Sequence, residues 1–273
     1  MIIPRGTLVA LATFVVAALV VAAPLGATTI LFLGNDAGPT FGADGAVMAH
    51  LQARYGAGNV SYLQGTASTT ADAMGKDAVI ISATLNSGDV RDKFEDVTAG
   101  VMNWEQALMT TTVGNFQMST SGGTTDSQTQ INIVDPVHPL AGGLNGTVTV
   151  TNTGQTFSHG GAPLGAGVAL VAELTSDPAG KKGIFAADVG GALLGDDSAG
   201  RPSTAPGRRV SFFLQDATFG DLTPDGITLF DAAVDWTANV SVIPEPSSVV
   251  LMVSGAAGLG LLGLRRRRRA RPA

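Results

Sequence analysis

Apolar runs of four to six residues alternate with amphipathic stretches in the first part of the chain. Thr29–Leu33 (TILFL) and Asp77–Ser82 (DAVIIS) have the continuous apolar character of strands that are buried on both faces. Between Ala43 and Tyr55, the residues Val47, Leu51 and Tyr55 recur at helical spacing. The same pattern predicts strands over 60–63 and 101–104, and helices over 71–74 and 90–97. This alternation predicts a parallel sheet with helices on both faces.

The second part of the chain has strand-like segments separated by Gly-rich turns. Strands are expected at Ile131–Val134, Thr147–Thr151, Val168–Leu174, Ile184–Ala187 and Val210–Leu214. The polar segments Ser119–Gln130 and Gly190–Arg208 are predicted to be surface loops, where ligands often bind.

A final helix is predicted over Thr223–Ala238. Thr223 is a suitable N-cap, Pro224 suits the first helical position, and Ile227, Phe230 and Val234 provide an apolar face.

The N-terminal 27 residues have the layout of a secretory signal peptide. Arg5 precedes an apolar run from Leu8 to Ala23, and the small residue Ala27 precedes Thr28. We expect signal peptidase to cleave after Ala27 because Pro24 disfavours cleavage after Ala23. The alternative is an N-terminal membrane anchor that is retained.

The C-terminal region combines three features. Pro244, Glu245 and Pro246 form an extended tripeptide, since proline fixes φ and cannot donate a backbone hydrogen bond. Ser247–Leu264 is uncharged and, as a helix, would cover roughly 27 Å, enough to cross a bilayer core. The cluster that follows consists of Arg265, Arg266, Arg267, Arg268 and Arg269, and such a cluster stays on the cytoplasmic side. A plain C-terminal tail anchor would have the same composition.

Composition limits the function of the body between these two ends. Thr28–Ile243 contains 9 Lys and Arg against 21 Asp and Glu, a net charge of −12, which argues against nucleic acid as a partner. The chain has no cysteine, so thiol catalysis, thiolate metal sites and disulfides are excluded. About 216 residues suit one domain.

The C-terminal region, 241–273, resembles a PEP-CTERM sorting signal: the tripeptide 244–246, a transmembrane helix over 247–264 and an arginine cluster over 265–271 occur in order. The resemblance implies that an exosortase, a membrane-embedded cysteine transpeptidase, removes the helix. It also implies a Gram-negative bacterium that makes an extracellular polysaccharide matrix, with the protein reaching the cell surface after a transient stay in the inner membrane.

The body, residues 28–240, is similar to the class I glutamine amidotransferase-like superfamily, and within it to trehalose-utilisation-like domains. The similarity rests on TILFLGND, DAVIISATL, VMNWEQALM, VDPVHPLAGGL, GRRVSFFLQD and LFDAAVDWTAN. It implies an α/β, flavodoxin-like three-layer sandwich with a mainly parallel sheet. The amidotransferases of that superfamily use a cysteine nucleophile that this chain lacks. A serine replacement among Ser82, Thr84 and Ser87 would lack the flanking glycines of a nucleophile elbow.

Histidine supplies the other candidate chemistry. Two prolines hold Asp135 and His138 in one turn, so the pair could serve as base and orienting group or could cap the following turn. His159 is expected in a flexible loop, and the three residues form an acid–base or metal site only if their loops meet. His50 is expected on a helix face. The acidic pairs Asp196–Asp197 and Asp221 with Asp225 lack the ligand pattern of an EF-hand, leaving a weak calcium site as the alternative.

A ligand crevice is expected beyond the carboxyl ends of the parallel strands. Asn35 and Asp36 follow the first strand and can bond sugar hydroxyls, and Thr84 follows the third. Trp104 follows the fourth strand, where its ring can either stack on a sugar or pack in the core.

These features predict an exported surface protein that is processed by an exosortase and needs no cofactor or bound metal. The body is expected to be non-catalytic and to bind, or be embedded in, exopolysaccharide. One alternative is a carbohydrate-active hydrolase or isomerase that uses Asp135, His138 and His159. Another is a matrix filler without a specific ligand.

Overall fold

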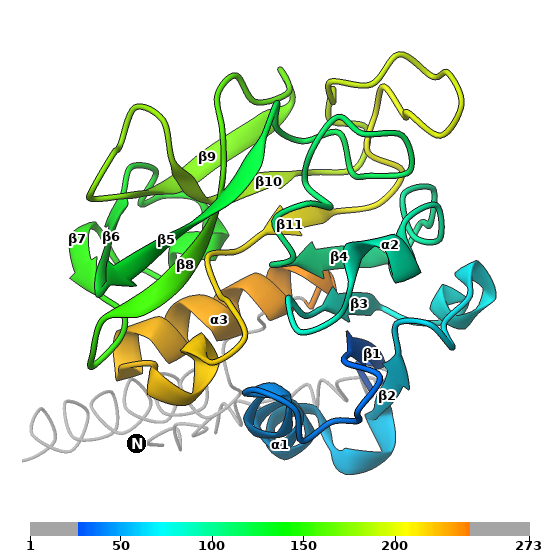
Figure 1. Cartoon of the computed structure of the whole chain (residues 1–273), viewed down its shortest axis with the longest axis horizontal. Coiled ribbons are helices and arrows are strands. Elements are labelled where there is room, and N and C mark those ends of the chain that lie inside the picture. The colour runs from blue at the N-terminus through cyan, green and yellow to red at the C-terminus, as the bar shows by residue number, and fades with distance from the viewer. Residues whose placement is uncertain (1–26, 241–273) are drawn as a thin grey trace, which may run out of the picture.

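The computed structural model describes residues 27–240, which form one mixed sheet with few helices (Figure 1). The signal peptide predicted over 1–27 lies outside these residues except for Ala27, and the whole sorting signal over 244–271 lies outside them. Within residues 27–240, no helix has both the length and the apolar character needed to cross a bilayer.

Eleven strands pair into a single sheet in which nine follow the order β2-β1-β3-β4-β11-β10-β9-β6-β7. β8 pairs with β10 outside this row, and β5 pairs with β8. The strands are β1 (Ile30–Gly34), β2 (Val60–Gln64), β3 (Ala78–Ile81), β4 (Gly100–Asn103), β5 (Gly122–Gln128), β6 (Gln130–Ile133), β7 (Gly146–Thr149), β8 (Gln155–Gly160), β9 (Val168–Leu174), β10 (Lys182–Ala187) and β11 (Arg209–Ser211).

The helical elements are short except for two. They are α1 (Asp44–Tyr55), α2 (Ser87–Val90), α3 (Pro224–Thr237) and the 3₁₀ helices η1 (Ala57–Asn59), η2 (Thr70–Ala73), η3 (Pro139–Ala141) and η4 (Thr218–Asp221). α3 begins as expected from the sequence, because Thr223 caps it by accepting a hydrogen bond from the Gly226 N–H and Pro224 occupies the first turn. The helix expected over 90–97 does not form, because α2 ends at Val90 and turns follow it.

The sheet is parallel in only one of its halves, so the expectation of a mainly parallel sheet is not confirmed. β2, β1, β3, β4 and β11 run parallel, whereas β11–β10, β10–β9, β9–β6 and β6–β7 pair antiparallel. Parallel neighbours need long crossover connections, while antiparallel neighbours can be joined by a short one, as β9 and β10 are through residues 175–181.

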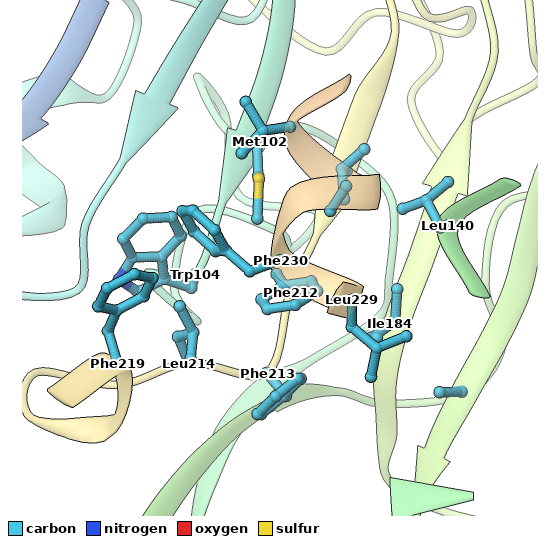
Figure 2. Packing of buried hydrophobic residues seen from close by; sticks show 14 of the residues in the cluster. Met102, Trp104, Leu140, Ile184, Phe212, Phe213, Leu214, Phe219, Leu229 and Phe230 are labelled. Carbon is cyan, nitrogen blue, oxygen red and sulfur yellow. The ribbon is translucent and has the colours of Figure 1, made fainter. Parts of the chain in front are cut away.

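Two cores lie on the two faces of the sheet, as alternate residues of β1 show: Ile30 and Phe32 face one core, and Leu31 and Leu33 face the other. α1 and α3 pack on the first core, where aromatic side chains such as Phe212 and Phe230 gather (Figure 2). α2 and long loops cover the second. Long helices therefore cover one face only, and the other face carries only short helical turns and loops.

Two polar segments were misjudged from the sequence. Ser119–Gln130 is not a loop, since most of it forms β5 and the start of β6. His159 is not in a flexible loop either, because it lies in β8 opposite Gly123 of β5. Thr, Ser and Gln side chains dominate this ribbon and half of β5 is exposed, so no apolar alternation marks it as a strand.

Candidate functional site

The carboxyl ends of β1 and β3 meet around a buried carboxyl group, Asp44, in the first turn of α1. Asp44 is 2 % exposed, and its two oxygens accept hydrogen bonds from Ser82 Oγ at 2.7 Å and from Thr84 Oγ1 at 2.6 Å. The Asn35 N–H points at the same carboxyl at 3.4 Å. Burial raises the pKa of Asp44, and the hydrogen bonds oppose that shift. This hydrogen-bond network fixes the start of α1 at the carboxyl ends of β1 and β3.

The network requires glycine at the end of β1. A Cβ on Gly34 would collide with the Asp44 carboxylate and with the Tyr62 ring. The Tyr62 hydroxyl in turn donates to the Asn35 carbonyl at 2.6 Å. The close approach of α1 to β1 and β3 therefore depends on a position without a side chain.

Three of the four predicted ligand-binding residues are engaged inside the protein. Asn35 Nδ2 donates to the Thr84 carbonyl at 2.6 Å, and the Thr84 hydroxyl donates to Asp44. The Trp104 ring is 2 % exposed and packs against Phe32 and Phe230, so it offers no stacking face to a sugar (Figure 2). Only Asp36 is exposed, and its carboxylate accepts a hydrogen bond from the Thr66 N–H at 3.3 Å.

Ser82 occupies a strand-to-loop turn where a nucleophile would be expected, but it is buried. The residue is 1 % exposed, its hydroxyl donates to the Asp44 carboxyl, and no hydrogen bond joins it to a histidine among residues 27–240. A serine nucleophile needs an adjacent base and an accessible oxygen. Ser82 therefore has a structural role here.

Sequence inspection missed two carboxyl groups at the same edge. Glu105 follows β4 and is 7 % exposed, with one oxygen accepting a hydrogen bond from the Ala107 N–H at 3.2 Å. Burial raises the pKa of Glu105 to about 7, and the nearby Asp216 adds to the shift. Burial also raises the pKa of Asp216. Glu105 lies in VMNWEQALM and Asp216 ends GRRVSFFLQD, but neither segment indicates that its carboxyl group is buried, so only the folded arrangement shows them to be unusual.

The structure does not bring Asp135, His138 and His159 together. His138 Nδ1 accepts from the Leu140 N–H at 3.2 Å and so caps η3, with its ring 5.5 Å from that of Trp236. Burial lowers the pKa values of both histidines, but the charges near His138 are Asp135, Asp188 and Arg208, whereas those near His159 are Lys181 and Asp177. The two imidazoles therefore share no charged neighbour.

The acidic pairs also serve local structure. Asp197 accepts from the Ser203 N–H and hydroxyl, and Asp221 accepts from Thr153 and Gln155. Between residues 27 and 240, no three His, Asp or Glu side chains meet in a way that could hold a metal ion.

A cavity of about 770 Å³ lies along the outer side of α3, away from the carboxyl edge. Its polar lining consists of Arg54, Arg208, Thr228, Asp231, Asp235, Trp236 and Asn239, and the other lining residues are small or apolar. We call this cavity the α3 groove. It was not predicted, because it needs the end of α1, the 3₁₀ helix η3 and α3 to lie side by side.

One charge network supports the wall of the α3 groove. Asp231 binds His50 Nε2 at 2.6 Å and Arg54 Nη1 at 3.2 Å. Asp235 accepts from the Tyr55 hydroxyl at 2.6 Å and pairs with Arg54 Nη2. His50 is thus a helix-face residue that pairs with α3.

No protein-family model matches this chain, and no curated protein matches it. Among solved structures, it is similar to a crystal structure of a ThuA-like (trehalose-utilisation-like) protein from Bacteroides uniformis. The TM-score is 0.51 and the sequence identity 11 %, over 79 % of this chain and 93 % of that chain. At this identity, the similarity concerns the fold alone. It agrees with the trehalose-utilisation-like fold expected from the sequence.

Proposed function

We propose that this chain is an exported surface protein of a Gram-negative bacterium whose domain binds exopolysaccharide without catalysing a reaction. Export is supported by the N-terminal sequence, which suits signal peptidase. Sorting by an exosortase is supported by the tripeptide, apolar segment and arginines between Pro244 and Arg269. In this proposal, the protein is in the inner membrane only transiently and then resides at the cell surface or in the matrix.

The observation that carries the non-catalytic assignment is the burial of Ser82. The chain has no cysteine, and the hydroxyl at the strand end is buried and donates to Asp44 at 2.7 Å. A hydroxyl buried in this way is not accessible to a substrate carbonyl. A domain with this fold and without a nucleophile is suited to binding.

Two measurements on protein from its native host test the proposal. The first is the intact mass, with fragmentation to locate both ends. A chain that begins near Thr28 and ends near Pro246 is the expected result, whereas a chain that retains 251–269 would contradict sorting. The second is retention of the processed protein on the host's own exopolysaccharide. Absence of retention would contradict glycan binding.

A second candidate function follows from Glu105 and replaces the histidine-based alternative. A buried carboxyl with a pKa near neutrality suits general acid–base catalysis, so a carbohydrate-active hydrolase or isomerase would use Glu105 with Asp216 nearby. The test compares Glu105→Gln and His138→Ala in glycan-degradation and sugar-isomerisation assays. Activity that is lost in the first variant and kept in the second would favour the enzyme, and inactivity of the wild type would leave the binding function.

A further inference from the structure

The α3 groove has a lining that is rich in charge yet balanced. Arg54 and Arg208 face Asp231 and Asp235, so two guanidinium groups accompany two carboxylates. An anionic ligand would meet the carboxylates and a cationic one the guanidinium groups. An apolar ligand would bury ion pairs at a cost that its contacts would not repay. The charge balance favours a neutral polar ligand.

These charged groups are held in fixed orientations before any ligand arrives. Arg54 bridges Asp231 and Asp235, while His50 and Tyr55 bind the same two carboxylates from α1. Each carboxylate oxygen can accept more than one hydrogen bond, so the network keeps acceptor capacity for ligand hydroxyls. A rigid polar wall lowers the entropy cost of binding.

Trp236 is held in place within the groove by a cation. The Arg208 guanidinium lies 4.7 Å from the centre of the indole ring, and Arg208 Nη1 donates to the Trp236 carbonyl at 2.7 Å. The Arg208 Nε donates to Asp188 at 3.2 Å, so the guanidinium is fixed at two further points. The indole is therefore held in one orientation in the lining of the groove.

Two groups in the lining have hydrogen-bonding capacity that the protein does not use. Neither the Trp236 indole N–H nor the Asn239 side-chain amide has a hydrogen-bond partner among residues 27–240. An indole N–H donates, and an amide both donates and accepts. Hydroxyl groups both donate and accept as well, so they complement this set together with the carboxylates.

We propose that the α3 groove binds a neutral saccharide segment, with hydroxyls paired to Asp231, Asp235 and Asn239 and a sugar face or edge against Trp236. This proposal rests on the proposed glycan-binding function and gives that function a location. The volume of about 770 Å³ is in the range of ligand pockets, which is about 300–1,000 Å³. The groove shares no lining residue with the carboxyl edge around Asp44, Ser82 and Glu105.

Tryptophan fluorescence gives a site-specific test because the chain has two tryptophans and Trp104 is buried. The full chain in detergent is titrated with the host's exopolysaccharide, with a neutral glucan (dextran), and with carboxylated alginate. We expect the neutral polymers to change the emission and to protect it from acrylamide, and alginate to bind at least tenfold more weakly. Trp236→Phe keeps a ring beside Arg208 and should remove the signal.

Affinity is measured separately by retention on immobilised host exopolysaccharide. Asn239→Ala removes an exposed side chain without a protein partner, and we expect a loss of about fivefold, equivalent to one hydrogen bond. Asn152→Ala is the matched control, since Asn152 is exposed, bonds to the Asp221 carbonyl and does not line the groove. It should bind like the wild type.

The results of these experiments distinguish saccharide binding in the α3 groove from glycan binding elsewhere on the protein. If the wild type binds and both Asn239→Ala and Trp236→Phe bind equally well, the groove assignment is wrong and the glycan function stands. If the wild type binds no polysaccharide, both are wrong. If Trp236 is shielded in the full chain and becomes accessible only after processing, another part of the chain fills the groove, and the saccharide assignment is overturned.

Discussion

Removing the Asp44 carboxyl tests whether the hydrogen bonds that it accepts from Ser82 and Thr84 stabilise the fold. In Asp44→Ala, the hydroxyls of Ser82 and Thr84 lose their acceptor while remaining buried. Hydrogen bonds to a charged group contribute about 1.5–3 kcal/mol each. Relief of the buried charge and the 3.1 Å contact between the two hydroxyls offset part of this loss. We expect a net loss of about 3 kcal/mol in the free energy of unfolding.

Asp44→Asn is the matched variant, because an amide has the same shape and can accept from one hydroxyl while donating to the other. We expect it to lose less than about 1 kcal/mol. Urea unfolding at pH 7 measures both variants, and an unchanged m-value shows that the folded state is intact. If Asp44→Ala loses less than about 0.5 kcal/mol in the free energy of unfolding, or if the two variants lose the same amount, the Asp44 hydrogen bonds do not stabilise the fold.

The stability difference between Asp44→Ala and the wild type depends on pH, and its sign follows from the raised pKa. Burial raises the pKa of Asp44 above 3.8, so the folded state favours the protonated carboxyl. The stability that this group adds is fully present below pH 3.8 and is lost as the pH rises through the raised pKa. The deficit of Asp44→Ala relative to the wild type should therefore be smaller at pH 8 than at pH 4.

Three further perturbations have defined outcomes. Glu105→Gln should be more stable than the wild type at pH 8 by up to about 3 kcal/mol. The wild type is destabilised as the pH rises from 4.5 through about 7, because the buried Glu105 carboxyl must then ionise. Equal stability of the two proteins in unfolding measured across this pH range would contradict the raised pKa. Arg209→Ala should lose about 3–5 kcal/mol in the free energy of unfolding, measured by thermal unfolding. The Arg209 side chain is 1 % exposed and donates to the carbonyls of Glu95, Val97 and Ala99. A loss under about 1 kcal/mol would show that water replaces the guanidinium as the donor to these carbonyls. Thr223→Ala should lose about 1 kcal/mol in urea unfolding through the missing cap of α3, an effect that Thr223→Ser should largely restore.

The local sequence pattern was sufficient to predict strands in the first half of the sheet and to predict the last helix. The apolar runs at 30–34 and 78–81 are buried strands, and the helical spacing of Val47 and Leu51 places both in the core beneath α1. Burial on one or both faces imposes a period that the sequence must carry. Thr223 and Pro224 mark the start of α3 because capping depends on neighbouring residues alone.

The candidate site could be predicted only in outline. The sequence indicated that Asn35 and Thr84 lie at the same edge of the sheet, and they do, within hydrogen-bonding distance. It did not indicate that Asp44 would accept a hydrogen bond from the Thr84 hydroxyl. It left open whether Trp104 would stack on a ligand or pack in the core, where the structure places it. Whether a polar side chain meets a ligand or a neighbour depends on contacts between distant residues.

The sequence by itself determined the presence of buried strands, the caps of α3 and the absence of any thiol chemistry, since each depends on residue type or on a short-range pattern. Only the tertiary structure decided the direction of β5–β10, the bonding of Ser82 and the existence of the α3 groove. The groove joins Arg54 to Asp231 and Asp235, which lie 177 and 181 residues further along the chain. Their proximity follows from the packing of α1 and α3 on one core, and no local pattern encodes it.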